Sequence, residues 1–378
     1  MSLDIRGTRR STTETYRHVD VVLLAAVAAI TGLGLLMIYS STRGRQATAG
    51  LDPSYFLHRQ ALFVVVGVAV MVVMTLVDYQ VLRDMAPAIY VASVLALLLV
   101  VSPLGTNNRG AQAWFQIGPY QFQPAEFGKI ALILALAAFC ATHRDDLDTN
   151  RLATALGIAA LPLALIYLQP DVGTGMVFVA ALMAIVLVGG ASPRQILILT
   201  LLGVTGIVLV LQLGVLKKYQ EERLAAFLDP QEDVQRTAYN LNQSKTAIAN
   251  GGLGGKGLFQ GTQTNLSFVP EQHTDFIFTA VGEELGFVGA ATLLAMFGLV
   301  MWRTWRAAVT AKDQFGTLVC VGILAMLVFQ VFENVGMTMG ITPIAGIPLP
   351  FMSYGGSSII AAFAAVGLVL NVQMRRYS

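Results

Sequence analysis

Charged residues, cysteine and histidine are all scarce in this sequence. Of its 378 residues, only 12% are Asp, Glu, Lys or Arg, whereas 55% are hydrophobic. Soluble domains carry about 25% charged residues, so the composition excludes a soluble protein and indicates an integral membrane protein. A net charge of +2 gives no indication of nucleic acid as a partner, and we predict none.

The sequence also lacks the clusters that carry metal, disulfide or serine chemistry. The two cysteines, Cys140 and Cys320, lie in apolar runs, and the four histidines are scattered. These positions predict neither a disulfide framework nor a structural zinc site. There is no G-x-S-x-G motif, so a serine nucleophile of that kind is not expected.

A glycine-rich stretch at 251–257 spells G-x-G-x-x-G through Gly252, Gly254 and Gly257. No strand or βαβ unit precedes it, and Gly257 stands where a P-loop needs Ser or Thr. We therefore reject a nucleotide site and predict flexible backbone that can approach a ligand closely.

Ten apolar runs are long enough to cross a membrane. They lie at about 20–40, 58–77, 85–103, 125–142, 152–168, 173–190, 194–215, 276–304, 314–333 and 355–373. This pattern predicts an all-α integral membrane protein with ten transmembrane helices, in which residues 1–378 form a single polytopic domain. The Arg-rich stretch 1–20 precedes a run that can span, so we expect an anchor and not a cleaved signal peptide.

Basic residues set the expected orientation. Those before the first run, after the last run and in alternate loops fall on one side of the membrane: Arg6, Arg9, Arg10, Arg17, Arg83, Arg144, Arg151, Arg194, Arg303, Arg306, Lys312, Arg375 and Arg376. The positive-inside rule then puts both termini in the cytoplasm. The segment 216–275, between the seventh and eighth helices, becomes a long extracytoplasmic loop.

Two segments of the expected outer face have unusual patterns. Val234, Ala238, Leu241 and Ile248 are spaced as on one helical face, which fits a helix on the membrane surface and equally a solvent-exposed helix. Segment 342–358 is too apolar for a solvated loop and too rich in Pro and Gly for a helix. It predicts irregular backbone packed inside the protein or lining a cavity.

Ionisable residues gather at the outer ends of the predicted helices: Arg59, Arg109, Glu126, Lys129, Asp171 and Asp275. Asp275, Thr279 and Glu283 are four residues apart and share one helical face. Glu126 and Lys129 are three apart and can pair. Charges in a membrane are costly unless they face a partner, water or a substrate, so a structural ion pair, an ion pathway and a lipid-diphosphate enzyme all stay open. No obvious inverted repeat favours a transporter.

Four motif blocks follow one another along the chain: Gly110 to Lys129 with its Gln-Pro-x-Glu, Gln169-Pro-Asp171, Pro270 to Phe278, and Gly346 to Ser358. Together they resemble the SEDS family (shape, elongation, division and sporulation), the bacterial cell-wall polymerases of the RodA, FtsW and SpoVE type. Gly346-Ile-Pro-Leu-Pro-Phe351 is most similar to the elongation branch, RodA. Ala125 departs from the pattern, because a serine is more usual there.

The resemblance implies a peptidoglycan glycosyltransferase that polymerises lipid II, an undecaprenyl-diphosphate-linked disaccharide pentapeptide. The reaction is expected at the outer face of the bacterial plasma membrane, where it serves cell elongation and rod shape. A class B penicillin-binding protein, which is a transpeptidase, is the implied partner, together with membrane lipids and other proteins of the elongation machinery. Mg²⁺ or Mn²⁺ is the implied cofactor, and no organic cofactor is expected.

Asp275 matches the essential aspartate of the family and is expected to be the general base of an inverting transfer. The expected substrate-binding residues are Arg59, Arg109, Glu126, Lys129, Asp171, Glu271, His273, Ser353 and Tyr354, and the candidate metal ligands are Asp275, Glu126 and Asp171. A lipid II flippase and a non-catalytic scaffold for a transpeptidase are the alternatives. A flippase needs ionisable groups through the full depth, and only Glu283, Glu284 and Glu333 are expected to lie deeper.

Overall fold

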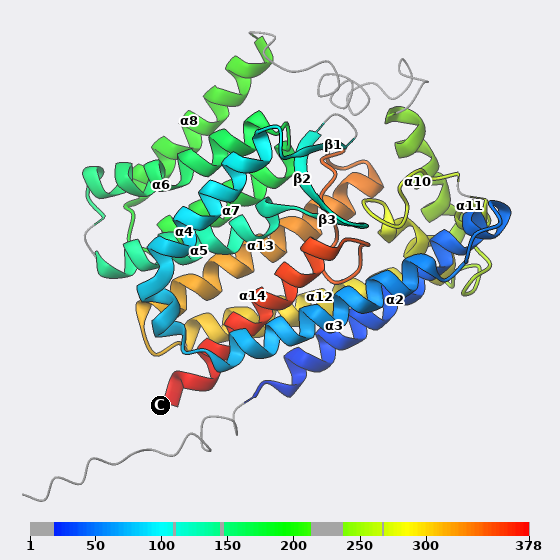
Figure 1. Ribbon diagram of the computed structural model, residues 1–378, viewed down its shortest axis with the longest axis horizontal. Coiled ribbons are helices and arrows are strands. Elements are labelled where there is room, and N and C mark those ends of the chain that lie inside the picture. Colours follow the sequence, from blue (N-terminus) through cyan, green and yellow to red (C-terminus); the bar gives the residue numbers. More distant parts are fainter. Residues whose placement is uncertain (1–18, 109–110, 144–146, 213–236, 267, 378) are drawn as a thin grey trace, which may run out of the picture.

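A computed structural model describes residues 19–108, 111–143, 147–212, 237–266 and 268–377, and it is largely helical (Figure 1). A helix forms over each of the ten apolar runs: α2 (Val21–Thr48), α3 (Tyr55–Leu76), α4 (Tyr79–Val101), α5 (Pro124–Thr142), α6 (Thr149–Leu168), α7 (Val172–Val188), α8 (Pro193–Gln212), α12 (Ile277–Val309), α13 (Gln314–Met339) and α14 (Gly356–Met374). By length and composition, eight helices in the described ranges can cross a membrane, and α7 is a shorter apolar helix. The protein is a helical membrane protein, and a count of ten spans stays a prediction.

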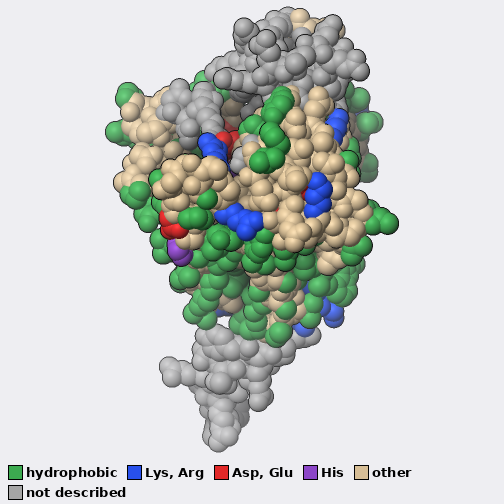
Figure 2. Space-filling model, turned by 90° about the vertical axis from the view of Figure 1, so that its right-hand side faces the viewer, with side chains coloured by type: hydrophobic (Ala, Val, Ile, Leu, Met, Phe, Trp, Pro, Cys, Tyr) green, Lys and Arg blue, Asp and Glu red, His purple; other side chains and the backbone are tan. Residues whose placement is uncertain are grey.

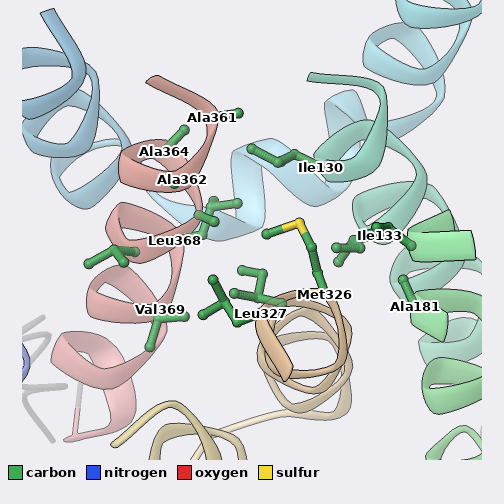
Figure 3. Close-up of a cluster of buried hydrophobic side chains, with 14 of the residues drawn as sticks. Ile130, Ile133, Ala181, Met326, Leu327, Ala361, Ala362, Ala364, Leu368 and Val369 are labelled. Carbon is green, nitrogen blue, oxygen red and sulfur yellow. The ribbon is translucent and has the colours of Figure 1, made fainter. Parts of the chain in front are cut away.

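Helix α13 lies in the middle of the bundle and packs against α5, α7, α12 and α14. Figure 3 shows Met326 and Leu327 of α13 between Ile130 and Ile133 of α5 and the alanine-rich face of α14. Small residues allow this close approach: a Cβ added at Gly322 of α13 would lie 2.8 Å from Ile133. Small residues at helix contacts are typical of membrane bundles, in which packing takes the place of the hydrophobic effect.

The two ends of the bundle differ. At one end, Asp20 caps α2 and accepts hydrogen bonds from Arg303 of α12 at 2.6 Å and from Gln373 of α14 at 3.0 Å. The start of α2 and the C-terminal end of α14, where a short 3₁₀ helix η2 (Arg375–Tyr377) follows, therefore lie together. The arginines predict that this end is cytoplasmic. The opposite end carries α10 (Thr237–Gly251), α11 (Thr262–Asn265) and three short strands (Figure 1).

The three strands form a small antiparallel sheet that we did not predict. Strand β2 (Ala111–Ile117) pairs with β1 (Thr106–Asn108) and with β3 (Tyr120–Phe122). Gly118, with φ +58°, and Pro119 form the turn between β2 and β3. Strands β1 and β3 have only three residues each, too few to give a periodic signal in sequence, and the seven residues of β2 lie between two apolar runs. The sheet leaves the helical class unchanged and shapes the loop that leads into α5.

Helix α10 contradicts one of the two interpretations of the stripe around 234–248, that of a solvent-exposed helix. Val234 lies outside the described residues. Leu241, Ser244 and Ala247 are buried, and α10 packs along α12 and α13. Ser244 donates a hydrogen bond to the carbonyl of Thr338 in α13 at 2.6 Å. This side of α10 is buried against α12 and α13, so α10 is not a freely solvated helix. A position at the membrane surface stays a prediction.

The glycine-rich stretch 251–257 also differs from the prediction. Its backbone lies against α12 and not in an open position for a ligand: Gly257 N donates to Glu284 O at 3.0 Å, and Phe287 N donates to Gly252 O at 2.9 Å. Helix α12 kinks there at Gly286, whose φ of 66° and ψ of −164° are open essentially to glycine alone. Glycine does permit a close backbone approach, but the partner is α12.

We expect Gly286→Ala to open this contact. The added Cβ would lie 2.2 Å from Gly255 N, and the backbone conformation would be strained as well. Limited proteolysis should cut the 251–262 segment faster in the variant, and the melting temperature should fall. Gly298→Ala in the same helix is the matched control, because its Cβ would meet nothing within 4 Å. Equal protease resistance of the two variants would contradict the assignment.

Candidate functional site

The four motif blocks meet around the segment 341–355, which we call the proline-rich loop. It has no regular secondary structure, as predicted for most of 342–358, and its Ile347, Leu349, Phe351 and Met352 are buried. The prediction was wrong for 356–358, which form the first turn of α14. Leu349 N donates to Ser353 Oγ at 2.8 Å, so Ser353 closes a turn within the loop. Irregular backbone at the end of a membrane bundle is tolerated where protein surrounds it. Residues of the other three motif blocks contact the proline-rich loop or its neighbours.

Asp275 lies on the short segment that leads into α12. Its side chain is partly exposed, while its backbone carbonyl accepts a hydrogen bond from Asn334 of α13 at 2.8 Å. The turn before it is closed by Glu271, at φ 53°, whose carbonyl accepts from Thr274 N at 3.1 Å. His273 O accepts from Tyr354 N at 2.8 Å. The Asp275 segment is thus fixed to the proline-rich loop by its backbone.

Aromatic side chains surround Arg59 near the start of α3. Its guanidinium donates to Tyr55 Oη at 2.6 Å and to the Pro119 carbonyl, and it lies 4.9 Å from the ring centre of Tyr120. Tyr354 packs edge-on against Phe56, with ring centres 5.1 Å apart. Burial raises the pKa of the Tyr354 hydroxyl above its usual value, and Arg59 opposes this shift. The hydroxyl is therefore neutral at pH 7 and can donate a hydrogen bond.

Gln60, which follows Arg59, ties α3 to the proline-rich loop. It is fully buried, its Nε2 donates to Ser353 O at 3.1 Å, and its Oε1 accepts from Gly355 N at 3.2 Å. Both ends of one amide are used on the same loop. A polar amide inside an apolar run could have identified Gln60 as a candidate site residue, since polar groups at membrane depth have a function by default.

Glu126 and Lys129 form a buried ion pair at the start of α5. Lys129 Nζ lies 2.8 Å from Glu126 Oε1, and the lysine and glutamate side chains are 3% and 4% exposed. They line a small cavity with Gln330 of α13, with Pro348 and Pro350 of the proline-rich loop, and with Met326, Ser358, Ala361 and Ala362. The cavity volume is about 10 Å³, which is enough for about one water molecule.

Asp171 is tied to the same region through Gln123. It caps α7, accepting from Thr174 N at 3.0 Å and from Thr174 Oγ1 at 2.8 Å. Gln123 Nε2 donates to it at 3.1 Å, and Gln123 N donates to Ser357 Oγ at 2.9 Å. The chain Asp171–Gln123–Ser357 therefore links the second motif block to the first and the fourth.

Glu283 and Glu284 have a role that we did not foresee. Glu283 is fully buried and accepts hydrogen bonds from Gln263 N at 2.8 Å, Thr264 N at 2.9 Å and Thr264 Oγ1 at 2.7 Å. Glu284 accepts from Ser40 of α2 and from Phe259 N. These carboxylates anchor the outer segment around α11 onto α12.

They also lie nearer the outside than expected. Helix α12 has 33 residues, about 50 Å at 1.5 Å per residue, whereas a bilayer core of about 30 Å needs about 20 residues. After the kink, Phe287 and Val288 are exposed apolar residues, and Trp302 and Trp305 are exposed near the other end. This distribution fits a lipid-facing span from Phe287 with tryptophans at the inner interface. Glu283 and Glu284, before the kink, then belong to the outer cap of the protein and are not deep membrane groups.

The residues of the site do not fit a resident metal ion. Among the described residues, no group of three or more His, Cys, Asp and Glu side chains could hold one. Of the candidate ligands, Glu126 is paired with Lys129, and Asp171 caps α7. We therefore derive no step through a protein-held cation.

The site combines predicted residues with others that we missed. Glu271, His273, Asp275, Ser353 and Tyr354 lie on two segments that hydrogen-bond to each other, and Glu126 with Lys129 lies against the proline-rich loop. Arg109 lies outside the described residues. The missed residues are Gln60, Gln330, Asn334 and Phe56. Figure 2 shows the end of the molecule with α10 and α11, where Lys and Arg side chains lie among polar surface and hydrophobic side chains cover the adjoining sides.

Relatives in the curated proteins match nearly the whole chain. The stage V sporulation protein E of Bacillus subtilis is 37% identical over 363 residues, covering 95% of this chain and 97% of its own. A probable peptidoglycan glycosyltransferase FtsW of Trichlorobacter lovleyi is 36% identical and covers 93% and 92%. The peptidoglycan glycosyltransferase MrdB of Escherichia coli K12 is 35% identical and covers 95% and 94%. Because these identities are nearly equal, they do not separate the branches of the family.

Solved structures also match nearly the whole chain. A chain from work on the structural coordination of polymerization and crosslinking by a peptidoglycan synthase complex superposes with a TM-score of 0.81 at 34% identity, covering 95% of this chain and 99% of that one. The rod shape determining protein RodA of Thermus thermophilus gives a TM-score of 0.71 at 30% identity, covering 95% of this chain and 98% of that one. The family model of the FtsW, RodA and SpoVE cell cycle proteins matches residues 21–378. This chain therefore belongs to the FtsW/RodA/SpoVE family and is a multi-pass protein of the bacterial plasma membrane.

Proposed function

We propose that this protein polymerises lipid II into glycan strands at the outer face of the plasma membrane, with Asp275 as the general base. The activity class follows from the family: relatives along the whole chain are peptidoglycan glycosyltransferases, and so is this chain. The elongation role rests on the Gly346 to Phe351 motif and on the similarity to a RodA structure.

One observation carries the assignment of the base. Asp275 is a partly exposed residue on a backbone segment that hydrogen bonds fix to the proline-rich loop and to α13. A general base must be reachable by substrate and must also hold its position to within a fraction of an ångström. The partial exposure of Asp275 is consistent with the first need, and the fixed backbone is consistent with the second.

In the reaction, the oxygen of the acceptor sugar hydroxyl attacks the anomeric carbon of the growing chain, and Asp275 takes the proton of that hydroxyl. The bond to undecaprenyl diphosphate breaks, and the configuration inverts. Arg59 uses two terminal nitrogens on Tyr55 and Pro119, and a guanidinium has five N–H donors, so donors remain for the leaving diphosphate. Lys129 is buried with Glu126, and we assign this ion pair a structural role, in which it supports the proline-rich loop without touching the substrate.

The divalent cation stays part of the proposal as a companion of the substrate. Mg²⁺ keeps several water ligands and is commonly bound by one or two carboxylates together with substrate phosphates. Such an ion would arrive with the lipid diphosphate, which needs no three-ligand group in the protein. Polymerisation should then depend on added Mg²⁺ or Mn²⁺, while the protein without the cation keeps its melting temperature.

The partner we propose is a class B penicillin-binding protein, which would cross-link the strands made here. A similar chain comes from a complex that coordinates polymerization and crosslinking. The flippase alternative loses support, because Glu283 and Glu284 serve as anchors of the outer segment instead of lining a path through the membrane.

The test is a polymerisation assay. Purified protein with its transpeptidase, lipid II and Mg²⁺ should give glycan polymers that are resolved on a gel. Transport of lipid II across vesicle membranes without polymer would instead favour a flippase. Absence of both activities in a folded complex that still binds the transpeptidase would favour a scaffold.

Arg59→Ala should weaken the use of lipid II. Loss of charge-assisted hydrogen bonds worth about 1.5–3 kcal/mol should lower the rate at limiting substrate by roughly 10–10²-fold. Polymer formation is measured against lipid II concentration. Arg45→Ala, an exposed arginine at the end of α2 on the same side, is the matched control and should keep the wild-type rate. Equal behaviour of the two variants would remove Arg59 from the diphosphate site.

A further inference from the structure

Asn334 of α13 is a buried amide between two motif segments. Its side chain is fully buried, and Nδ2 lies 2.8 Å from the carbonyl of Asp275 and 2.8 Å from the carbonyl of Ile347. Two carbonyl oxygens are both acceptors, so the NH₂ side of the amide must face them. Both protons of one NH₂ group are thus used to join the Asp275 segment to the proline-rich loop.

The position of Asn334 in the helix extends this connection. Gln330 lies one turn earlier, on the same side of α13, and lines the cavity beside the Glu126–Lys129 pair. This side of α13 therefore runs from the buried ion pair to the backbone of Asp275. The Oδ1 atom of Asn334 has no hydrogen-bond partner among the described residues. A buried amide that leaves one acceptor unsatisfied costs stability, so Asn334 is not the residue that stability alone would select.

We propose that Asn334 is a positioning residue that sets the place of the Asp275 carboxylate relative to the proline-rich loop; this rests on the proposed role of Asp275. Asn334 acts on the carbonyl of the same residue whose side chain takes the proton, so a shift of this carbonyl moves the base directly. A misplacement of about 1 Å can lower a rate by about 10²-fold. Without the amide, the link from α13 to the Asp275 carbonyl and to the Ile347 carbonyl is lost, and the remaining bond from Tyr354 N to His273 O holds the segment less firmly.

The chain offers a matched control for a purely structural role. Asn371 of α14 is also fully buried, and its Nδ2 also donates to two backbone carbonyls, those of Met74 and Val77. Asn371 lies beside Arg375, at the opposite end of the bundle from the site. Asn371→Ala removes the same two donor bonds to backbone carbonyls, together with an acceptor for Arg375 Nη1, and it leaves the site untouched.

The experiment compares Asn334→Ala, Asn371→Ala and Asp275→Asn in the full-length protein with its transpeptidase, using lipid II at varied concentration. Both alanine variants should lower the melting temperature, and Asn371→Ala should lower it at least as much, because it also loses the bond from Arg375. Asn334→Ala should lower the maximal rate roughly 10–10²-fold with the half-saturating lipid II concentration within about twofold of wild type. Asn371→Ala should keep the maximal rate within about twofold. In the Asp275→Asn background, Asn334→Ala should change the residual rate little, because the base it positions is gone.

A fall in maximal rate that is equal in the two alanine variants, or a full multiplicative effect on the Asp275→Asn background, would overturn the proposal. If Asn334→Ala does not accumulate, Asn334→Thr keeps a similar volume and loses the NH₂ group without adding a charge, and the same rate comparison applies. The two hypotheses fail separately. An inactive wild type refutes the proposed function, a fully active Asp275→Asn refutes the base, and both results are obtained before Asn334 is changed.

Discussion

Asp275→Asn should lower polymerisation by roughly 10²–10⁴-fold, the usual contribution of a general base. The amide keeps nearly the shape of the carboxylate, but it cannot take the hydroxyl proton. The backbone carbonyl that accepts from Asn334 is unchanged, so the fold and the proline-rich loop should persist. Polymer formation on a gel measures the rate, and the melting temperature checks the fold.

Asp52→Asn is the matched control for this change. Asp52 is an exposed carboxylate between α2 and α3, and its bonds are to Ser54. This variant should polymerise at the wild-type rate. Binding of lipid II and of the transpeptidase should survive in Asp275→Asn, because a lost base affects the transition state. Wild-type polymer yield from Asp275→Asn would refute the mechanism.

Lys129→Met should be the most destabilising single change in the site. It leaves Glu126, of which 4% is exposed, as a buried carboxylate without its cation, and breaking such a pair costs about 3–5 kcal/mol. Replacing both partners removes the uncompensated charge, so Lys129→Met with Glu126→Gln should recover much of the lost stability. Thermal unfolding in detergent, followed for the single and double variants, measures this recovery.

The activity of the same variants separates structure from catalysis. If the pair supports the proline-rich loop without touching the substrate, the stabilised double variant should regain part of the polymerisation rate. If Lys129 itself binds the diphosphate, the double variant should be stable and inactive. Equal instability of the single and double variants would contradict the ion-pair account of the stability loss.

Many residues of the site could be predicted from local sequence, but the residues that they hydrogen-bond to could not. Asp275, Glu126 and Lys129 are charged residues next to apolar runs, and that contrast is visible without a structure. The pairing of Glu126 with Lys129 was foreseen, because their spacing of three residues fixes their neighbourhood on a helix. Asn334 and Gln60 are also polar residues in apolar runs, but their partners are 13 to 295 positions away in the chain. No periodic pattern encodes such contacts.

Glu283 and the glycine-rich stretch show where local reasoning fails. Counting residues into an apolar run placed Glu283 inside the membrane, and glycine content indicated a flexible ligand loop. The kink at Gly286 divides α12 into an outer part and a spanning part, and the glycines allow the outer segment to lie on its backbone. Both outcomes depend on which segments meet, which is a property of the whole packed chain.

The class of the protein could be established from the amino-acid sequence, because apolar runs of this length have no stable alternative to a membrane helix. The irregular, buried character of the proline-rich loop could be established in the same way, since proline and glycine exclude a helix and its apolar side chains avoid water. That this loop joins the four motif blocks, and that α13 presents Asn334 to Asp275, became visible only in the folded chain. Those contacts join residues distant in sequence, and the packing of small residues between helices sets which of them touch.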